Sequence, residues 1–498
     1  MRFTITPERT RFKRDPMLYG HFLEHFHRQV YGGVYDPGSP LSDEDGFRAD
    51  VLEALRRIRV PVIRWPGGCF VSSYDWKKGV GPARTPVFDK AWRVEEPNTF
   101  GTDEFIKLCR KLGCEPYICT NAGTGSAEAM SDWVEYCNLE REGEYARMRI
   151  ANGHPEPYRV KYWSVGNENY GGWEIGAKGA AEWGRLVTES AKMIQRVDPT
   201  ASLSAAALVD LDWNINLLRG CAERLDWISI HAYWDAIQNT NALAPYARCM
   251  AYTADTETAI RRVRGLLTAM GLEKKIRIAF DEWNLRGWYH PNIHTTCQGR
   301  TPEEYLLPRD DNDLNASYTM ADAVFSACFL NALLRNADIV GMANFSPMVN
   351  TRGGIYTHPK GIVLRPTYHV FDMYVNLMGD TVVDGWARDA EPYVTPGPDG
   401  DVTVDAVDCV ATLDSRTGAI AVACVNKHET GARTVELTVP VRGEARVTSL
   451  VGASPDDYND VGRDSVCPAS NDDAILERRA DGLRLRLPAH SVNILRIG

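Results

Sequence analysis

Residues 160–169 read VKYWSVGNEN, an apolar run that ends abruptly in polar side chains. The apolar part, Val160–Val165, has the length and composition of a buried strand. Residues 180–197, AAEWGRLVTESAKMIQRV, follow it, and their apolar positions recur every three or four residues, as in an amphipathic helix. A strand followed by a helix is the building unit of a parallel sheet. The stretch therefore predicts an α/β protein with polar side chains at a strand end.

The same strand-then-helix unit recurs along residues 17–380. The predicted strands are Met17–Phe22, Val60–Arg64, Glu115–Cys119, Val160–Val165, Ser202–Ala206, Trp227–His231, Ile276–Phe280 and Ile339–Ala343. The predicted helices include Asp50–Ile58, Thr102–Leu112, Ala127–Leu139, Ala180–Val197, Glu257–Met270 and Tyr318–Asn336. Eight such units in succession predict a (β/α)8 TIM barrel.

From about residue 381 the helical periodicity gives way to alternating strands, which predicts a C-terminal β-sandwich. The strands expected there are Val402–Val407, Ala419–Val425, Thr434–Val439, Ala445–Leu450 and Leu483–Leu487. Residues 2–5 also have strand character and precede the barrel. We therefore expect three parts: an N-terminal segment 1–16 that joins the sandwich, a catalytic barrel 17–380 and the sandwich 381–498.

The composition is that of a globular protein, because 44% of the 498 residues are hydrophobic and 24% are charged. The formal net charge of -10 offers no positive field to phosphate backbones, so nucleic acid is not expected as a partner. We expect no membrane span and no secretory signal, since long apolar runs are missing and the first residues are rich in charge. The 12 cysteines are scattered singly, which predicts reduced thiols and a cytoplasmic protein.

Polar residues at the carboxyl ends of the strands form the candidate site, because barrel active sites collect at that end. Glu168 follows the fourth predicted strand and Glu282 the seventh. Such a pair suits glycoside hydrolysis, in which one carboxylic acid protonates the leaving oxygen while the other, ionised, attacks the anomeric carbon. Carboxyl groups about 5 Å apart give retention and groups roughly 6.5–9.5 Å apart give inversion, and both outcomes stay open at this point.

Other residue types near those strand ends fit a pocket for sugars. Asn167 can hold a sugar hydroxyl beside the reacting carbon, and Tyr233 can hydrogen-bond the nucleophile. Tryptophans offer flat apolar faces on which sugar rings can stack. The candidates for such stacking are Trp65, Trp92, Trp173, Trp234, Trp283 and Trp288.

A series of short motifs marks these strand ends in order. It comprises Gly20-His21-Phe22-Leu23-Glu24-His25, Arg64-Trp65-Pro66-Gly67-Gly68, Ala91-Trp92, Gly166-Asn167-Glu168, Ser229-Ile230-His231-Ala232-Tyr233 and Phe280-Asp281-Glu282-Trp283-Asn284. The series resembles the retaining glycosidase clan whose barrels carry Asn-Glu after strand four and Glu after strand seven. More narrowly it resembles family 51 glycoside hydrolases, the α-L-arabinofuranosidases, over nearly the whole chain.

The resemblance implies a retaining, exo-acting enzyme that removes terminal α-L-arabinofuranosyl residues from oligosaccharides through a covalent glycosyl-enzyme. It implies Glu168 as the acid/base and Glu282 as the nucleophile. The residues implied to shape the subsite for the terminal sugar are Glu24, Arg64, Asn167, His231 and Tyr233, and we add Cys69 and Trp92 as candidate substrate-binding residues. It also implies a homo-oligomer, commonly a hexamer, and neither a metal nor an organic cofactor.

The chain departs from the family pattern inside the expected site. Cys69 stands where an asparagine is usual, which exchanges a two-donor amide for a weak thiol donor. Pro347 replaces an expected sugar-contacting glutamine, and Arg286 stands where a tryptophan often lines the aglycone side, with Trp288 two positions later. The run 350–354 differs as well. These changes leave open a different furanoside or an endo-β-glucanase, beside a subfamily that binds the same sugar by other contacts.

Two further interpretations come from other classes. His21, His25 and His27 after the first strand, with His231, suggest a metal-dependent hydrolase, although further ligands are not evident. A carbohydrate-binding inactive relative is the second alternative, which the presence of both glutamates disfavours. The loop 285–315, with its histidines at 290 and 294, is expected to act as a lid or to contact a neighbouring subunit.

Overall fold

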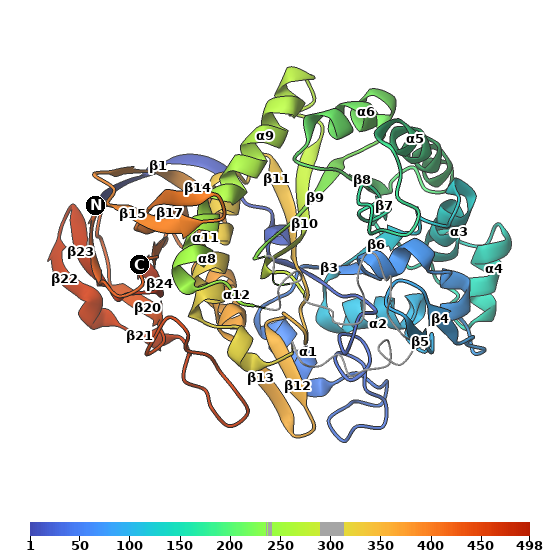
Figure 1. Cartoon of the computed structure of the whole chain (residues 1–498), viewed down its shortest axis with the longest axis horizontal. Helices are drawn as coiled ribbons and strands as arrows, with labels where there is room; N and C mark the ends of the chain where they lie inside the picture. The colour runs from blue at the N-terminus through green and yellow to red at the C-terminus, as the bar shows by residue number, and fades with distance from the viewer. Residues whose placement is uncertain (236, 238–241, 289–312) are drawn as a thin grey trace.

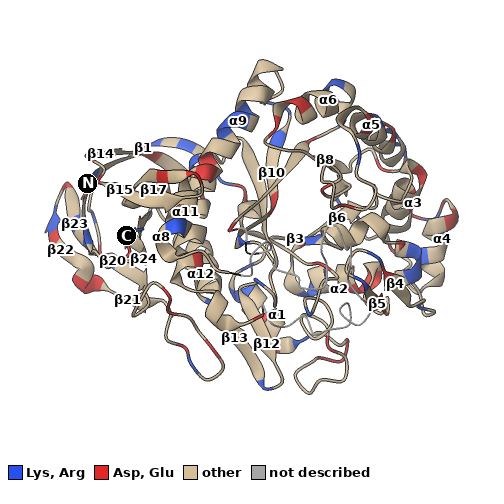
Figure 2. Ribbon diagram, in the orientation of Figure 1, with Lys and Arg blue, Asp and Glu red and all other residues tan. Residues whose placement is uncertain are grey.

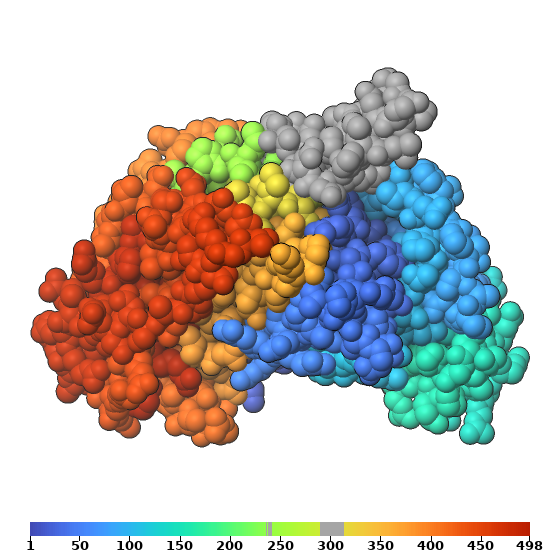
Figure 3. Space-filling view, turned by 90° about the horizontal axis from the view of Figure 1, so that it is seen from below, coloured from blue at the N-terminus to red at the C-terminus, as the bar shows by residue number. Residues whose placement is uncertain are grey.

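The computed structural model describes residues 1–235, 237, 242–288 and 313–498. Its two main parts are a closed parallel barrel and a C-terminal region rich in strands (Figure 1). In the space-filling view the C-terminal region, orange to red, directly adjoins the gold segments of the barrel (Figure 3). The predicted combination of a (β/α)8 barrel and a β-sandwich is confirmed.

Eight parallel strands close the barrel in chain order within the described residues. They are β2 (Gly20–Phe22), β3 (Val62–Trp65), β6 (Glu115–Thr120), β7 (Tyr162–Val165), β8 (Ser202–Ala206), β9 (Trp227–Asp235), β10 (Arg277–Arg286) and β11 (Val340–Phe345). The ring closes where β11 pairs with β2, Asn344 opposite Gly20. All carboxyl ends therefore lie at one mouth of the barrel.

Helices surround this barrel. They are α1 (Ala49–Arg57), α2 (Thr102–Leu112), α3 (Ala127–Asn138), α4 (Glu144–Ala151), α5 (Ala180–Val197), α6 (Leu211–Cys221), α8 (Tyr246–Ala251), α9 (Asp255–Ala269), α11 (Met320–Arg335) and α12 (Pro366–Leu377). Thr319 and Asp322 form a capping box that starts α11. Residues 320–334 of that helix are all buried, because it lies between the barrel and the C-terminal strands (Figure 1).

The first barrel strand is shorter than predicted. Pro16–Tyr19 form a 3-10 helix, η1, in place of the expected start of the strand at Met17. The side chain of Asp15 accepts a hydrogen bond from the Met17 amide at 3.1 Å, and the proline occupies the first helical turn. Both features favour a helical start. The prediction also left out α6, which begins where Asp210 caps the Trp213 amide.

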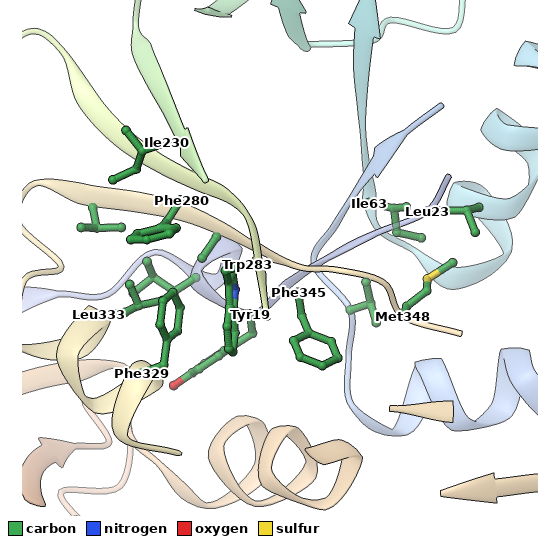
Figure 4. Packing of buried hydrophobic residues seen from close by; sticks show 14 of the residues in the cluster. Tyr19, Leu23, Ile63, Ile230, Phe280, Trp283, Phe329, Leu333, Phe345 and Met348 are labelled. Atoms are coloured by element: carbon green, nitrogen blue, oxygen red, sulfur yellow. The ribbon is translucent and has the colours of Figure 1, made fainter. Parts of the chain in front are cut away.

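Apolar side chains fill the interior of the barrel at one end. A cluster near the amino ends of the strands comprises Met17, Val62, Tyr117, Tyr162, Trp227, Ala279 and Met342. On the outside, Trp283 of β10 stacks on Phe329 of α11 with ring centroids 3.7 Å apart, and Phe345 packs beside it (Figure 4). The barrel is therefore a filled scaffold that leaves only its carboxyl mouth for chemistry.

The C-terminal region is built on one ten-stranded sheet among the described residues, in the order β21-β20-β24-β18-β17-β14-β1-β19-β23-β22. The bounds are β1 (Arg2–Lys13), β14 (Thr381–Arg388), β17 (Val407–Leu413), β18 (Ile420–Asn426), β19 (Arg433–Thr438), β20 (Ala445–Leu450), β21 (Ala469–Ser470), β22 (Ile475–Arg479), β23 (Gly482–Leu487) and β24 (Ser491–Ile497). Side chains from both halves, such as Val422 and Leu485, share one core, so the sheet folds over on itself as a sandwich.

The N-terminal strand β1 lies inside this sheet. It pairs antiparallel with β14 and parallel with β19. The predicted strand Val402–Val407 is wrong as a single strand, because its residues belong to two. Gly400–Asp405 form β16, which pairs with β15 (Pro392–Gly397), and the chain turns at Ala406, whose amide bonds to the Glu391 carbonyl, before β17 begins.

Basic and acidic residues are interspersed along both parts of the molecule (Figure 2). None of the helices in the described ranges is both long and apolar enough to cross a membrane.

Candidate active site

Two carboxyl groups face each other at the carboxyl mouth of the barrel. Glu168 follows β7 and Glu282 lies on β10. One oxygen of each and one ring nitrogen of His231 all lie within 4.8 Å of one another. This separation matches the roughly 5 Å of retaining glycosidases and falls short of the 6.5–9.5 Å that an inverting enzyme needs to seat a water.

Glu282 is held by two short hydrogen bonds. Arg64 Nη1 on β3 donates to Glu282 Oε2 at 2.7 Å, and the Tyr233 hydroxyl on β9 donates to Oε1 at 2.6 Å. Arg64 is fully buried and also donates to Asn167 Oδ1 at 2.6 Å. A buried guanidinium and a phenol bond to separate oxygens of the carboxylate and fix its orientation, as a nucleophile requires.

Glu168 lies in a more solvent-exposed environment than Glu282. His231 Nδ1 lies 2.9 Å from Glu168 Oε1, and the indole of Trp173 donates to Oε2 at 2.9 Å. Trp173 is 54% exposed, so this half of the site opens to solvent. Burial acts to raise the pKa of Glu168, but the hydrogen bonds from His231 and Trp173 outweigh it and lower the pKa below its ordinary value.

His231 balances the charge of the pair. Its Nε2 lies 3.1 Å from Ser229 Oγ and 3.4 Å from Asp281 Oδ1, while its Nδ1 faces both glutamates. Burial alone would lower the pKa of His231, but Glu282, Asp281 and Glu168 together raise it to about 10. The imidazole is therefore a cation that joins the two carboxyl groups.

Glu24, at the end of β2, has a different environment. Its Oε1 accepts hydrogen bonds from the Phe70 amide at 3.2 Å and from the Trp92 indole at 3.0 Å. Burial, with the charge of Glu282 as the next cause, raises the pKa of Glu24 to about 8. A Cβ at Gly67, where φ is +142°, would lie 2.3 Å from Glu24 Cγ, so only glycine lets this carboxyl reach the pocket.

Sequence reasoning missed several residues of the site. Arg352 Nη2 donates to the Tyr233 hydroxyl at 2.8 Å, and Ser346 Oγ lies 2.7 Å from the same hydroxyl. Arg352 belongs to the run 350–354, which the sequence marked only as a departure. A further carboxyl group, Glu174, lies buried beside Asn167. Its position six residues after Glu168 was the available signal.

Three of the departures, Cys69, Pro347 and Arg286, have different surroundings. Cys69, on η2 (Cys69–Ser73), is partly exposed, and its Sγ lies within 4.8 Å of oxygens of Glu168 and Glu174. Burial and the neighbouring carboxyl groups raise the pKa of the Cys69 thiol well above its ordinary value, so it stays protonated. Pro347 follows Ser346, which contacts Tyr233.

The interpretation of Arg286 as a change in the aglycone contacts is wrong. Its side chain is 2% exposed and forms ion pairs with Asp235 at 2.6 Å and with Asp322 at 3.1 Å. These pairs tie β10 to β9 and α11. Arg286 therefore stabilises the fold and does not reach a ligand.

The six candidate tryptophans have different surroundings. Trp65 and Trp283 are fully buried and belong to the core, which corrects the interpretation of both as sugar platforms. Trp234 packs on Phe325 at 4.9 Å. Those at the site are Trp92 and Trp173, each of which donates its indole N–H to a glutamate of the pocket, as described above. Trp288 packs against Phe26 and His27 at 5.7 and 5.5 Å.

The histidines of the first strand end do not form a metal site in the described structure. His25 Nδ1 bonds to Glu96 at 3.0 Å and its Nε2 accepts from the Trp65 indole at 3.0 Å, so both ring nitrogens are engaged. Burial lowers the pKa of His21 to about 4. Glu168, His231 and Glu282 do lie close enough to share an ion, but Arg64 and the protonated imidazole already supply the positive charge. Most of the loop 285–315, with the predicted histidines 290 and 294, lies outside the described residues.

The fold and this carboxyl pair define the class of barrel glycoside hydrolases. A family described as "Alpha-L-arabinofuranosidase 1 domain" matches residues 54–249, and one described as "Alpha-L-arabinofuranosidase C-terminal domain" matches residues 281–491. The chain is 33% identical to alpha-L-arabinofuranosidase C of Emericella nidulans, over 99% of this chain and 96% of that protein. It is 32% identical to an intracellular exo-alpha-(1->5)-L-arabinofuranosidase of Halalkalibacterium halodurans, over 97% and 96%.

Among solved structures, the thermostable GH51 alpha-L-arabinofuranosidase from Thermotoga petrophila RKU-1 matches with a TM-score of 0.85 and 33% identity, over 100% of both chains. The chain therefore belongs to the α-L-arabinofuranosidases of glycoside hydrolase family 51, and it is a glycosidase.

Proposed function

We propose that this protein removes terminal α-L-arabinofuranosyl residues from oligosaccharides by double displacement, with Glu282 as nucleophile and Glu168 as acid/base. The observation that carries the proposal is the short distance between the two carboxyl groups, with one oxygen of each inside a 4.8 Å cluster with His231. That distance leaves no room for a water between nucleophile and sugar, so the carboxylate itself attacks.

In the first step, a Glu282 oxygen bonds to the anomeric carbon as the glycosidic bond breaks. Arg64 and Tyr233 each donate a hydrogen bond to one oxygen of this carboxylate. The proton of Glu168 passes to the leaving oxygen, so the leaving group departs as an alcohol. In the second step Glu168, now ionised, takes a proton from water, the water oxygen bonds to the anomeric carbon, and the carboxylate of Glu282 is released.

The remaining pocket residues are proposed to bind the terminal sugar. Asn167 is fixed by Arg64, and Trp92 is fixed by Glu24 and packs on Phe26 with ring centroids 4.2 Å apart. With its raised pKa, Glu24 is protonated below about pH 8 and can donate a hydrogen bond to a sugar hydroxyl. Cys69 contributes a neutral thiol to the same pocket.

The test is hydrolysis of a panel of 4-nitrophenyl glycosides: α-L-arabinofuranoside, β-D-galactofuranoside, α-D-arabinofuranoside, β-D-xylopyranoside and β-D-glucopyranoside. We expect clear preference for α-L-arabinofuranoside. Activity confined to another sugar would mean that Cys69 and Pro347 mark a changed specificity. No activity on any of the five, with hydrolysis of a β-glucan, would favour the endo-acting alternative, and binding without turnover would favour the inactive relative.

Three further features belong to the proposal. The division into a segment 1–16, a barrel 17–380 and a sandwich 381–498 is supported by the pairing of β1 with β14 and β19. A cytoplasmic location is supported by the relative named intracellular. A hexamer is proposed from the family resemblance, and sedimentation of the purified protein tests it.

A further inference from the structure

Glu174 is a buried carboxyl group that the mechanism above does not use. It lies between β7 and α5 and is 4% exposed. Its Oε1 accepts hydrogen bonds from Ser72 Oγ and, at 3.4 Å, from Asn167 Nδ2. Its Oε2 is buried and has no hydrogen-bond partner in the part of the chain that the structure describes. A buried carboxylate oxygen without a partner is costly, so the surroundings favour a proton on this group.

Glu174 also lies next to the acid/base. One of its oxygens, one oxygen of Glu168 and Cys69 Sγ are all within 4.8 Å of one another. Burial first, and then the charge of Glu168, raise the pKa of Glu174 to about 7, while Cys69, Ser72 and Asn167 beside it act to lower the pKa. Two carboxyl groups this close titrate as a pair, since the ionisation of one opposes the ionisation of the other.

We propose that Glu174 is a positioning residue for the acid/base, because it forms with Glu168 a carboxyl pair that keeps one proton available for the leaving oxygen. This inference rests on the proposed function. Both carboxyl groups are close enough to interact through space, and their interaction needs no hydrogen bond between them. The pair acts before the glycosidic bond breaks, when the acid must carry its proton.

The charges around Glu168 explain why such a partner is needed. His231 from β9 and Arg64 from β3 stabilise the ionised form of Glu168, as does the Trp173 indole. The carboxyl group of Glu282 from β10 and the Tyr170 hydroxyl, 3.3 Å from Glu168 Oε1, also face it. These contacts alone would take the proton from the acid well below neutral pH. Glu174 is faced by Cys69 and Ser72 from η2 and by Asn167.

With the pair intact, one proton is shared between the two groups until about pH 7, where the pair loses it. Over that range a constant fraction of molecules carries the proton on Glu168. Without Glu174, the protonated fraction of the acid falls about tenfold for every pH unit above its own pKa. The pair therefore extends the active range toward neutral pH.

The experiment is the pH profile of kcat/KM for Glu174→Gln, which keeps the shape of the side chain and removes its charge. Methyl α-L-arabinofuranoside, whose leaving group needs a proton, is compared with the 4-nitrophenyl glycoside, whose leaving group does not. We expect the basic limb to move down by about one pH unit or more with the methyl glycoside and to stay with the nitrophenyl glycoside. Melting temperatures are measured alongside.

Three variants make the result specific. Ser72→Ala removes a hydrogen bond that acts to lower the pKa of Glu174 but leaves both carboxyl groups, so its basic limb should stay or move up, and not move down. Glu174→Asp keeps a carboxyl group and should restore part of the range if the Gln variant is poorly folded. Glu189→Gln, on an exposed residue of α5, controls for the loss of a negative charge elsewhere.

A profile of Glu174→Gln that overlays that of the unaltered protein on the methyl glycoside would overturn the carboxyl pair and leave the proposed function standing. An equal shift on both substrates would also overturn it, since the effect would then not concern the acid. If the unaltered protein hydrolyses neither arabinofuranoside, both the proposed function and the pair are contradicted.

Discussion

The two halves of the site are built differently around the same kind of side chain. Glu282 lies on a barrel strand and is held by Arg64, which is fully buried, and by Tyr233. Glu168 lies just beyond its strand and is held by His231 and by Trp173, which is 54% exposed. A nucleophile needs a fixed charge, whereas an acid/base must exchange its proton with water in every turnover. The surroundings of each glutamate match its proposed task.

The largest effect is expected at the half of the site that holds Glu282. Glu282→Gly removes the attacking oxygen, and turnover should fall by about 10⁴-fold or more, on all substrates alike. Initial rates on an aryl and an alkyl arabinofuranoside check this. Residual activity within tenfold of the unaltered protein would show that another group is the nucleophile.

Substitution of Glu168 should have an effect that depends on the leaving group. Glu168→Ala should slow hydrolysis of alkyl arabinofuranosides by roughly 10²–10⁴-fold, because their leaving oxygen must be protonated. Bond cleavage in a nitrophenyl glycoside should be much less affected, and a burst of nitrophenol should show that the second step is now slow. Equal losses in the cleavage step of both substrates would contradict the acid assignment.

A smaller effect is expected when one support of the nucleophile is removed. Tyr233→Phe deletes the hydrogen bond to Glu282 Oε1 but leaves Arg64 in place, so kcat should fall by about tenfold to a hundredfold. Tyr246→Phe is the matched control, since the Tyr246 hydroxyl is buried and has no partner in the described structure. Similar losses in both variants would show that the effect is one of packing.

The smallest effect is expected at Cys69, which lies beside Glu168. Cys69→Asn replaces a neutral thiol by an amide with two donors beside Glu168 and Glu174, and it should change the preference among furanosides by several-fold. The ratio of kcat/KM values on the L-arabino and D-galacto glycosides measures this. The control is Cys467→Asn at an exposed thiol. A change in melting temperature with no change in that ratio would place Cys69 in a purely structural role.

The order of the barrel strands and the positions of both glutamates could be predicted from the sequence, because each depends on a local pattern. An apolar run that ends in Asn167-Glu168 specifies a strand and the residue at its mouth at once. Arg352 and Glu174 were not predictable in this way, since each lies in a connecting segment whose path depends on the tertiary fold. The burial of Trp65 and Trp283 was missed because strand residues alternate between two faces, and the sequence does not say which face meets the helices.

The most direct test of the central claim is the stereochemistry of transfer to methanol. The short carboxyl separation requires two displacements at the anomeric carbon, so the sugar should leave with its original configuration. With 4-nitrophenyl α-L-arabinofuranoside in aqueous methanol, proton NMR should show methyl α-L-arabinofuranoside as the transfer product. Formation of the methyl β-anomer would contradict the account, because it requires a single displacement.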